Sequence, residues 1–257
     1  MQPPPGTSRL AWRLYAPIAT LIGMASLVVL CVAWTPFALL GQWLLPQRRA
    51  VRMGRRAIHV CFRLYTGILQ RLCGCRFDLQ DLDALAASPG SAVVVANHPS
   101  LLDAVLIVSR LPNAVCIMKG SLARNVLLGA GARMAGYIVN DSALTVVRRG
   151  VEALQSQPTK LVIFPEGSRT NHPPLDLCQS TAGVIAARAQ VPVAVMSIRF
   201  NSPYLGKDLP WFRPAQLPLT VQIQQVGQMV VDRHSAHAFG DTIARVLRAA
   251  LLKNDSC

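Results

Sequence analysis

The longest apolar run in the chain lies near its N-terminus. Residues 14–47 contain no charged side chain, and most positions between residues 16 and 45 are apolar. About 20 apolar residues suffice to cross a bilayer, whereas a signal peptide has a shorter apolar region of about 7 to 15 residues. The run therefore predicts a retained, membrane-embedded helical segment. Because proline removes a backbone donor, Pro36 leaves two forms open: one kinked span, or a helical hairpin that enters one leaflet.

Beyond about residue 75 the pattern changes to short β-branched runs separated by longer helical stretches. This alternation predicts an α/β fold with a largely parallel sheet flanked by helices. The expected strands cover residues 92–96, 115–118, 161–164, 193–198 and 219–226. The expected helices cover residues 101–110, 142–155, 181–189 and 232–253. Residues 202–218 contain four prolines and predict a loop, because a residue before proline avoids the helical conformation.

The charges on either side of the apolar segment predict its orientation in the membrane. Eight arginines and no acidic residue lie between it and Asp78, and only Arg9 and Arg13 precede it. The positive-inside rule then places the C-terminal side in the cytoplasm, and we expect the inner membrane as the location. The cluster attracts anionic lipid headgroups or only fixes the topology. The formal charge of +14 requires an anionic partner without choosing one, but the few aromatic residues give no support to nucleic-acid binding.

Cysteine and histidine spacing predicts neither a metal site nor a cofactor site. The seven cysteines are an odd number without a repeated C-x-x-C spacing, and we interpret them as reduced thiols facing the cytosol. His234 and His237 share a helical spacing but lack further nearby ligands. Gly129 and Gly131 lack the third glycine of a dinucleotide-binding turn.

A histidine and a carboxylate follow the first expected strand of the sheet. The sequence NHPSLLD spans residues 97–103, with His98 at the strand end and Asp103 five positions later. If a helix starts near Pro99, one turn brings Asp103 beneath the imidazole. A carboxylate that accepts the ring N–H fixes the tautomer and leaves the other nitrogen free to take a proton. Taken alone, the pair fits a helix-capping histidine beside a surface charge better than it fits a general base.

A second polar motif follows another expected strand. FPEGSRT at residues 164–170 places Glu166, Gly167, Ser168 and Arg169 in a turn. A guanidinium suits a phosphate because it donates two parallel hydrogen bonds, and a glycine lets the backbone approach a ligand closely. Since the carboxyl ends of parallel strands form the ligand-binding edge of such folds, we expect the two motifs to converge.

NHPSLLD and FPEGSRT resemble the first and third blocks of the lysophospholipid acyltransferase superfamily, which includes the glycerol-phosphate and lysophosphatidic acid acyltransferases. Residues 119–122 and 136–138 resemble the second block, and residues 191–193 the fourth. The resemblance covers about residues 92–200 in the family's order. It implies a glycerolipid acyltransferase fold, with an N-terminal anchor at residues 1–60 and a catalytic domain at residues 61–257.

The resemblance also implies roles for individual residues. His98 would be the base and Asp103 its partner, while the residues from Glu166 to Arg169 would form part of the site for the acceptor's phosphate. We assign Asn97, Lys119 and Arg124 to substrate binding as well, the last two as headgroup contacts. The expected reaction transfers a fatty acyl group from acyl-CoA or acyl carrier protein to a lysophospholipid, with 1-acyl-sn-glycerol-3-phosphate as the first choice and no cofactor.

One departure from the family pattern keeps another acceptor open. Relatives often carry a basic residue and a glycine shortly after the third block, whereas residues 177–183 read LCQSTAG. Some relatives acylate amino-acid lipids or pigment-type lipids instead. A serine esterase is disfavoured, because the chain lacks a Gly-x-Ser-x-Gly elbow. A non-enzymatic membrane tether would explain the charge and the apolar segment but not the two polar motifs.

Overall fold

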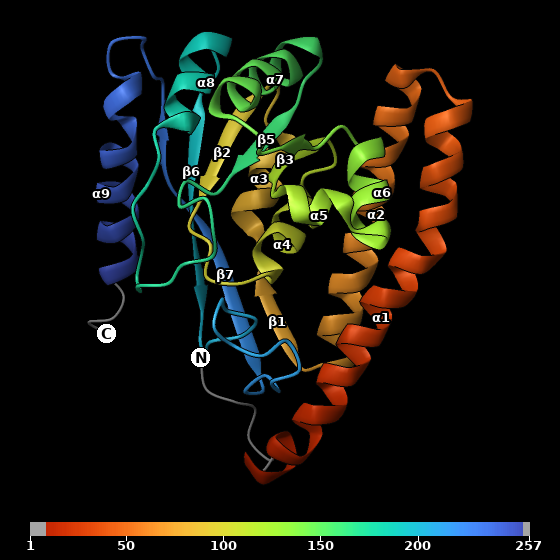
Figure 1. The fold of residues 1–257 in the computed structure, drawn as a ribbon. Helices are drawn as coiled ribbons and strands as arrows, with labels where there is room; N and C mark the ends of the chain where they lie inside the picture. The colour runs from red at the N-terminus through yellow and green to blue at the C-terminus, as the bar shows by residue number, and fades with distance from the viewer. Residues whose placement is uncertain (1–8, 254–257) are drawn as a thin grey trace.

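Within the part of the chain that the structure describes, seven strands form one sheet in the order β1-β7-β6-β2-β5-β3-β4. All neighbouring pairs are parallel except β6 with β7, so the prediction of a largely parallel sheet is confirmed. The computed structural model describes residues 9–253 (Figure 1). The strands are β1 (Cys75–Asp78), β2 (Ala92–Ala96), β3 (Ala114–Met118), β4 (Ile138–Val139), β5 (Lys160–Ile163), β6 (Val193–Phe200) and β7 (Leu219–Met229).

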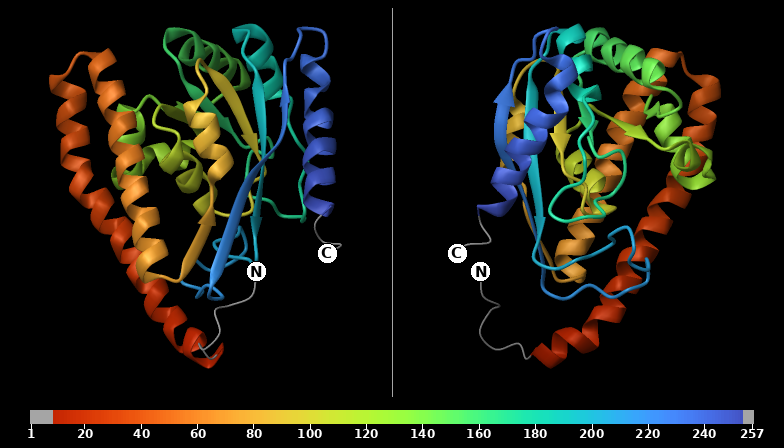
Figure 2. Two further views of the ribbon diagram at one scale, coloured as in Figure 1. Left: turned by 180° about the vertical axis from the view of Figure 1, so that it is seen from behind. Right: turned by 60° about the vertical axis from the view of Figure 1, so that its left-hand side comes forward.

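Helices cover both faces of the sheet, which is why its central strands are apolar throughout (Figure 2). All five residues of β2 are buried. Val93 and Val95 pack into the core beneath α7 (Ala143–Ser156), α8 (Thr181–Ala189) and α9 (Phe239–Leu252), while Val94 and Ala96 face the core on the other side. That second core is covered by α2 (Gln47–Leu72), α3 (Gln80–Ala87) and α4 (Leu102–Arg110).

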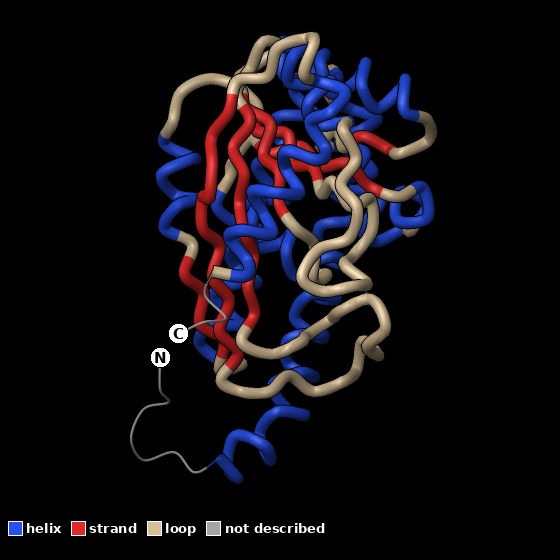
Figure 3. Tube along the Cα trace, turned by 90° about the vertical axis from the view of Figure 1, so that its left-hand side faces the viewer, coloured by secondary structure: helices blue, strands red, loops and turns tan. Residues whose placement is uncertain are grey.

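The predicted elements agree with the structure apart from their ends. The five expected strands are all present, and residues 202–218 form the expected loop (Figure 3). One helix boundary was wrong: the helix expected from residue 232 begins at Phe239, after a short 3-10 turn at Ala236–Ala238. Asp232 instead accepts a hydrogen bond from the backbone N–H of Ser235 at 2.7 Å, which favours a turn over a helix.

The apolar segment forms one long helix, α1 (Arg9–Leu44), which continues through Pro17 and Pro36. Residues Leu10–Leu44 are long and apolar enough to cross a membrane. One side of α1 packs on α2 and on α6 (Val126–Met134), where Gln42 Nε2 donates to the carbonyl of Ala130 at 3.1 Å. The other side exposes large apolar side chains along its whole length, namely Leu10, Leu14, Ile18, Leu21, Val28, Val29, Val32, Phe37, Leu39, Leu40, Trp43 and Leu44.

The helix α2 runs unbroken through residue 60, where we expected the anchor to end. The division into an anchor and a catalytic domain stays a prediction. Most arginines of the basic cluster are exposed, but Arg55 is buried. Its guanidinium donates to the carbonyl of Ala135 and to the side chains of Asn113 and Thr159, at 2.9–3.1 Å. Burial lowers the pKa of Arg55 to about 10. Arg55 thus fixes α2 to the domain rather than facing lipid.

Candidate active site

His98 and Asp103 form a hydrogen-bonded pair at the carboxyl end of β2. His98 lies two residues beyond the strand, and Asp103 lies in the first turn of α4. The imidazole Nδ1 and Asp103 Oδ2 are 2.9 Å apart. The geometry expected from the five-residue spacing is therefore present: the carboxylate can hold the proton on Nδ1, and Nε2 is then the nitrogen with a free lone pair.

Asp103 is fully buried, and its two oxygens have different surroundings. Oδ2 accepts the backbone N–H of Ser100 at 2.7 Å in addition to the imidazole. Oδ1 has no hydrogen-bond partner among the described residues. Burial raises the pKa of Asp103 to about 6, although the bonds from His98 and Ser100 act in the opposite direction. The carboxylate is therefore ionised near neutral pH but is costly to bury.

The ring of Phe164 stacks on one face of the imidazole of His98. The two ring centroids are 4.0 Å apart and the planes differ by 16°. Phe164 directly follows β5, the neighbour of β2, so its position is set by the sheet. The His98 side chain keeps 16% of its surface exposed. The ring is thus fixed on one face, and its remaining accessible part is small.

Glu166 joins the FPEGSRT turn to the backbone of His98. Oε1 accepts the His98 backbone N–H at 2.9 Å, and Oε2 accepts the backbone N–H of Asp176 at 3.0 Å. The backbone N–H of Thr170 donates to the His98 carbonyl at 2.8 Å. The two motifs therefore converge as expected, but each Glu166 oxygen already accepts a backbone bond. This geometry gives Glu166 a positioning role, and the substrate contact that we expected stays a prediction.

Gly167 and Ser168 make the turn itself. Gly167 has φ +69°, a left-handed conformation that favours glycine, and its N–H donates to the carbonyl of Phe164 at 3.0 Å. Ser168 Oγ donates to the carbonyl of Arg169 at 3.2 Å. Both residues shape the backbone beside His98.

Arg169 extends from this turn to the loop at residues 202–218. Its Nη1 donates to the carbonyls of Leu205 and Gly206, at 3.0 and 2.6 Å. A guanidinium has five N–H groups, and within the described residues the structure records hydrogen bonds from Nη1 alone. The remaining N–H groups are available to a phosphate, so the expected headgroup contact stays a prediction.

Residues 76–199, which hold both motifs, match the family model described as Acyltransferase. This part of the chain is similar to the acyltransferase family. The resemblance seen in the sequence is confirmed. The 1-acyl-sn-glycerol-3-phosphate acyltransferase beta of Homo sapiens is 26% identical over 70% of this chain and 66% of that protein. The alpha enzyme of the same name from Mus musculus is 32% identical over 50% of this chain and 48% of that protein.

A solved structure shares the fold. The 1-acyl-sn-glycerophosphate (LPA) acyltransferase PlsC from Thermotoga maritima superposes with a TM-score of 0.68 at 20% identity, over 94% of this chain and 98% of that one. The chain spans between 39% and 66% of the length of the curated relatives that it matches.

Within the acyltransferase domain, Asn97 has a structural contact where we expected a substrate contact. Its side chain is buried, with Nδ2 donating to the carbonyl of Ile198 at 2.9 Å and Oδ1 accepting the N–H of the same residue at 2.7 Å. Asn97 therefore replaces a sheet hydrogen-bond pair and fixes the end of β2 to β6. The expected role of this amide in substrate binding stays a prediction.

Lys119 and Arg124 lie at the two ends of the short helix α5 (Gly120–Arg124), directly after β3. Both side chains are exposed. Because β3 is two strands from β2 in the sheet, the end of β3 lies about 10 Å from the end of β2. The structure thus puts both cations at the same sheet edge as His98, without a direct contact to it.

The sequence reasoning missed several residues that shape the acyltransferase site: Phe164, Ser100, Asp176, Leu205 and Gly206. Phe164 is the first letter of FPEGSRT, so its position at a strand end was a usable signal. The other four act through backbone groups, as donors to Asp103 and Glu166 or as acceptors from Arg169. Every residue type carries the carbonyl and every type but proline carries the N–H, so the sequence holds almost no signal for them.

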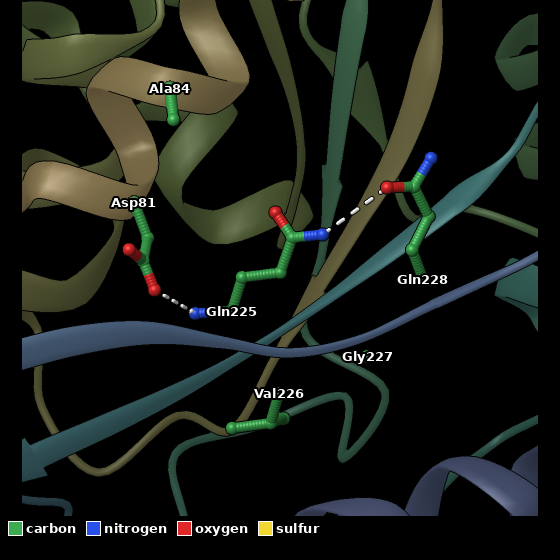
Figure 4. A pocket seen from close by; sticks show the side chains of 6 residues that line it. All are labelled: Asp81, Ala84, Gln225, Val226, Gly227 and Gln228. Carbon is green, nitrogen blue, oxygen red and sulfur yellow. Dashed lines mark hydrogen bonds between the residues drawn. The ribbon is translucent and has the colours of Figure 1, made fainter.

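Other features of the described residues do not add to this site. A hollow of about 410 Å³ lies over β7 and α3, where Gln225 donates its backbone N–H to Asp81 at 2.7 Å (Figure 4). It contains none of the predicted site residues. No group of three or more His, Cys, Asp or Glu side chains that suits a metal occurs in the described part of the chain. Six cysteines are free there, and Cys257 lies outside it.

Proposed function

We propose that this chain transfers a fatty acyl group from an acyl thioester to the free hydroxyl of a lysophospholipid, with 1-acyl-sn-glycerol-3-phosphate as acceptor and phosphatidic acid as product. The observation that carries the proposal is the His98–Asp103 pair, joined through Glu166 to the FPEGSRT turn. The names of the curated relatives and of the solved structure support this acceptor.

The geometry suggests a direct transfer in which His98 acts as general base. With Nδ1–H donated to Asp103, Nε2 takes the proton of the acceptor hydroxyl as its oxygen attacks the thioester carbonyl. The new ester C–O bond forms, the C–S bond breaks, and the thiolate leaves with the proton held on His98. Asp103 stabilises the imidazolium that forms in between. No acyl-enzyme is required, because the acceptor oxygen is itself the nucleophile.

Membrane association is part of the proposal. The exposed apolar side of α1 suits the hydrocarbon region of a bilayer, and the exposed arginines of α2 suit anionic headgroups. By the arginine bias we place the catalytic residues at the cytoplasmic face of the inner membrane. The donor is acyl-CoA or acyl carrier protein, and the basic chain suits the negative charge of either one.

One experiment tests the class of reaction and the substrate together. The purified full chain is incubated in vesicles with a panel of lysolipids and with either acyl-CoA or acyl carrier protein loaded with the same acyl group, and products are identified by mass spectrometry. We expect phosphatidic acid from lysophosphatidic acid, and none with His98→Ala. Absence of acylation of every acceptor by a folded, membrane-bound protein would favour the tether and refute the proposal.

A second acceptor class has a specific observation in its favour. The stretch at residues 177–183 lacks the cation expected after the third block. In addition, Arg169 Nη1 already donates to two backbone carbonyls. Both features weaken a site for a phosphomonoester and fit an amino-acid or pigment-type lipid. The panel therefore includes these acceptors, and faster acylation of one of them would replace lysophosphatidic acid.

The headgroup contacts need their own variants. We propose that Lys119, Arg124 and the free N–H groups of Arg169 bind the acceptor's phosphate. Arg169→Ala, Lys119→Ala and Arg124→Ala should each raise the KM for lysophosphatidic acid more than they lower kcat. Arg188→Ala in α8, on the other side of the sheet, serves as the charge-matched control. Unchanged saturation by the acceptor in all three variants would contradict this assignment.

A further inference from the structure

Two neighbouring aromatic side chains stand in water at the tip of the loop between β6 and β7. Trp211 is 62% exposed and Phe212 63% exposed. Their rings meet edge to face, with centroids 5.6 Å apart and planes at 87°. Exposed aromatic pairs of this kind are a common mark of an interaction surface, because leaving them in water forgoes the free energy of burying them.

The base of this loop, at Leu205, is hydrogen-bonded to the FPEGSRT turn and to the NHPSLLD motif. The carbonyl of Leu205 accepts two bonds, from the backbone N–H of Leu101 at 3.1 Å and from Arg169 Nη1 at 3.0 Å. Leu205 itself has φ +51° and is buried. A leucine in the left-handed conformation persists where its surroundings hold it. The tip is therefore attached to a fixed base that contacts the two motifs of the site.

The loop lies beside the N-terminal part of α1. Its last residue, Pro218, lines a hollow of about 270 Å³ together with Trp12 and Tyr15 of α1. Figures 1 and 3 both show the loop projecting next to this part of the helix. The apolar side chains that α1 exposes here, Leu14 among them, belong to the side that we assigned to the bilayer. The loop that carries the aromatic tip thus lies beside an apolar surface that already has an expected partner.

The charges around the aromatic pair favour the same partner. Lys207 and Arg213 flank it and are exposed, with Asp208 as the one acidic residue in the tip, which we define as residues 207–213. Tryptophan is enriched at the level of lipid headgroups, and basic residues near a membrane surface are attracted by anionic lipids.

We propose that this tip is a second membrane-docking element, which inserts Trp211 and Phe212 into the interfacial region of an anionic bilayer. The proposal rests on the membrane placement of α1 in the proposed function. Through Arg169 and Leu205, docking of the tip holds the loop base against the catalytic turn. An acceptor that leaves the bilayer between α1 and the tip then reaches His98 without crossing bulk water.

Fluorescence quenching tests the insertion without requiring turnover. The full chain is reconstituted in vesicles of phosphatidylcholine and phosphatidylglycerol in equal parts, with either ordinary or dibrominated acyl chains. The emission of Trp211 is obtained as the difference between wild type and Trp211→Phe. We expect this component to be quenched by the brominated lipid. As the matched control, a tryptophan is introduced with Val230→Trp, at an 89% exposed position beyond the far end of β7, and its added emission should not be quenched.

Kinetics tests the consequence. The double variant Trp211→Ser, Phe212→Ser should raise the apparent KM for a long-chain acceptor in vesicles on the order of tenfold, with little change for a short-chain acceptor dispersed in detergent. Val230→Ser should change neither. Quenching without any acyl transfer would contradict the proposed function and leave the docking intact. Normal transfer with unquenched Trp211 emission would overturn the docking. If Trp211 emission stayed unquenched by brominated lipid and changed only when acyl carrier protein was added, the docking would also be overturned, in favour of a protein partner.

Discussion

Asp103→Asn should separate the stability of the fold from its activity. Asp103 Oδ2 accepts both bonds to the carboxylate, whereas Oδ1 has no partner among the described residues. An asparagine can therefore place its oxygen where Oδ2 lies and keep both bonds. Its NH₂ group then occupies the position of Oδ1. The shape of the site is preserved, and the buried charge is removed.

The size of the effect follows from the pKa of Asp103, which burial raises from 3.8 to about 6. This displacement corresponds to about 3 kcal/mol. Because the folded state binds the proton more tightly than the unfolded state, the contribution is fully present below pH 3.8 and is lost as the pH rises through 6. In wild type, burying the ionised carboxylate therefore costs about 3 kcal/mol at neutral pH.

The assay is equilibrium urea unfolding in a mild non-ionic detergent, for wild type and Asp103→Asn, across this pH range. The difference in unfolding free energy, variant minus wild type, should increase by about 2.5 kcal/mol between pH 4 and pH 7. This comparison cancels the fixed cost of burying the NH₂ group. Acyl transfer should fall by about 10²- to 10⁴-fold, because the imidazolium loses its counter-charge. A difference that stays flat with pH would refute the reasoning on burial.

Four further variants test single contacts. Asn97→Ala removes two hydrogen bonds between β2 and β6, so it should lower the unfolding free energy by about 1 to 3 kcal/mol without a selective rise in acceptor KM; such a selective rise would support its expected role in binding. Gly54→Ala would place a Cβ 2.7 Å from the backbone nitrogen of Ala135, directly after α6, and it should cost about 1 to 3 kcal/mol of stability. Gly67→Ala in the same helix meets only a flexible side chain and should be neutral or stabilising by up to about 1 kcal/mol; equal effects in the two variants would contradict this packing. Phe164→Leu removes the ring stacked on His98 and should lower kcat on the order of tenfold, which steady-state kinetics measures; an unchanged kcat would show that the stacking has no part in orienting the imidazole.

Local patterns predicted the parts of the structure that local physics determines. The core strands were recognisable because β-branched residues that are buried on both faces form continuous apolar runs, as in β2 and β5. The pairing of His98 with Asp103 followed from one helical turn after a strand end. Both predictions used residues that are close together in the sequence.

The helix α2 was missed although its buried positions recur at helical spacing. Ala50, Gly54, Ile58, Tyr65 and Leu69 lie on one side of it, but the many arginines between them mask the apolar period. Short elements such as β1 and β4 carry too few residues to establish a period.

The backbone partners of two predicted substrate-binding side chains lie far along the chain, so local patterns could not predict these contacts. The partner of Asn97 is Ile198, and the partners of Arg169 are Leu205 and Gly206. These contacts depend on the order of strands in the sheet, which brings the loop after β6 beside the turn after β5. Residue type alone cannot distinguish a polar side chain that binds the backbone from one that binds a ligand.

The account depends on His98 as the base that takes the proton of the acceptor. The most direct measurement compares wild type with His98→Ala in vesicles containing lysophosphatidic acid and an acyl thioester, with phosphatidic acid quantified by mass spectrometry and folding checked by circular dichroism. We predict steady product formation by wild type and none above background with the folded variant. Product formation by folded His98→Ala at a rate near that of wild type would contradict the account.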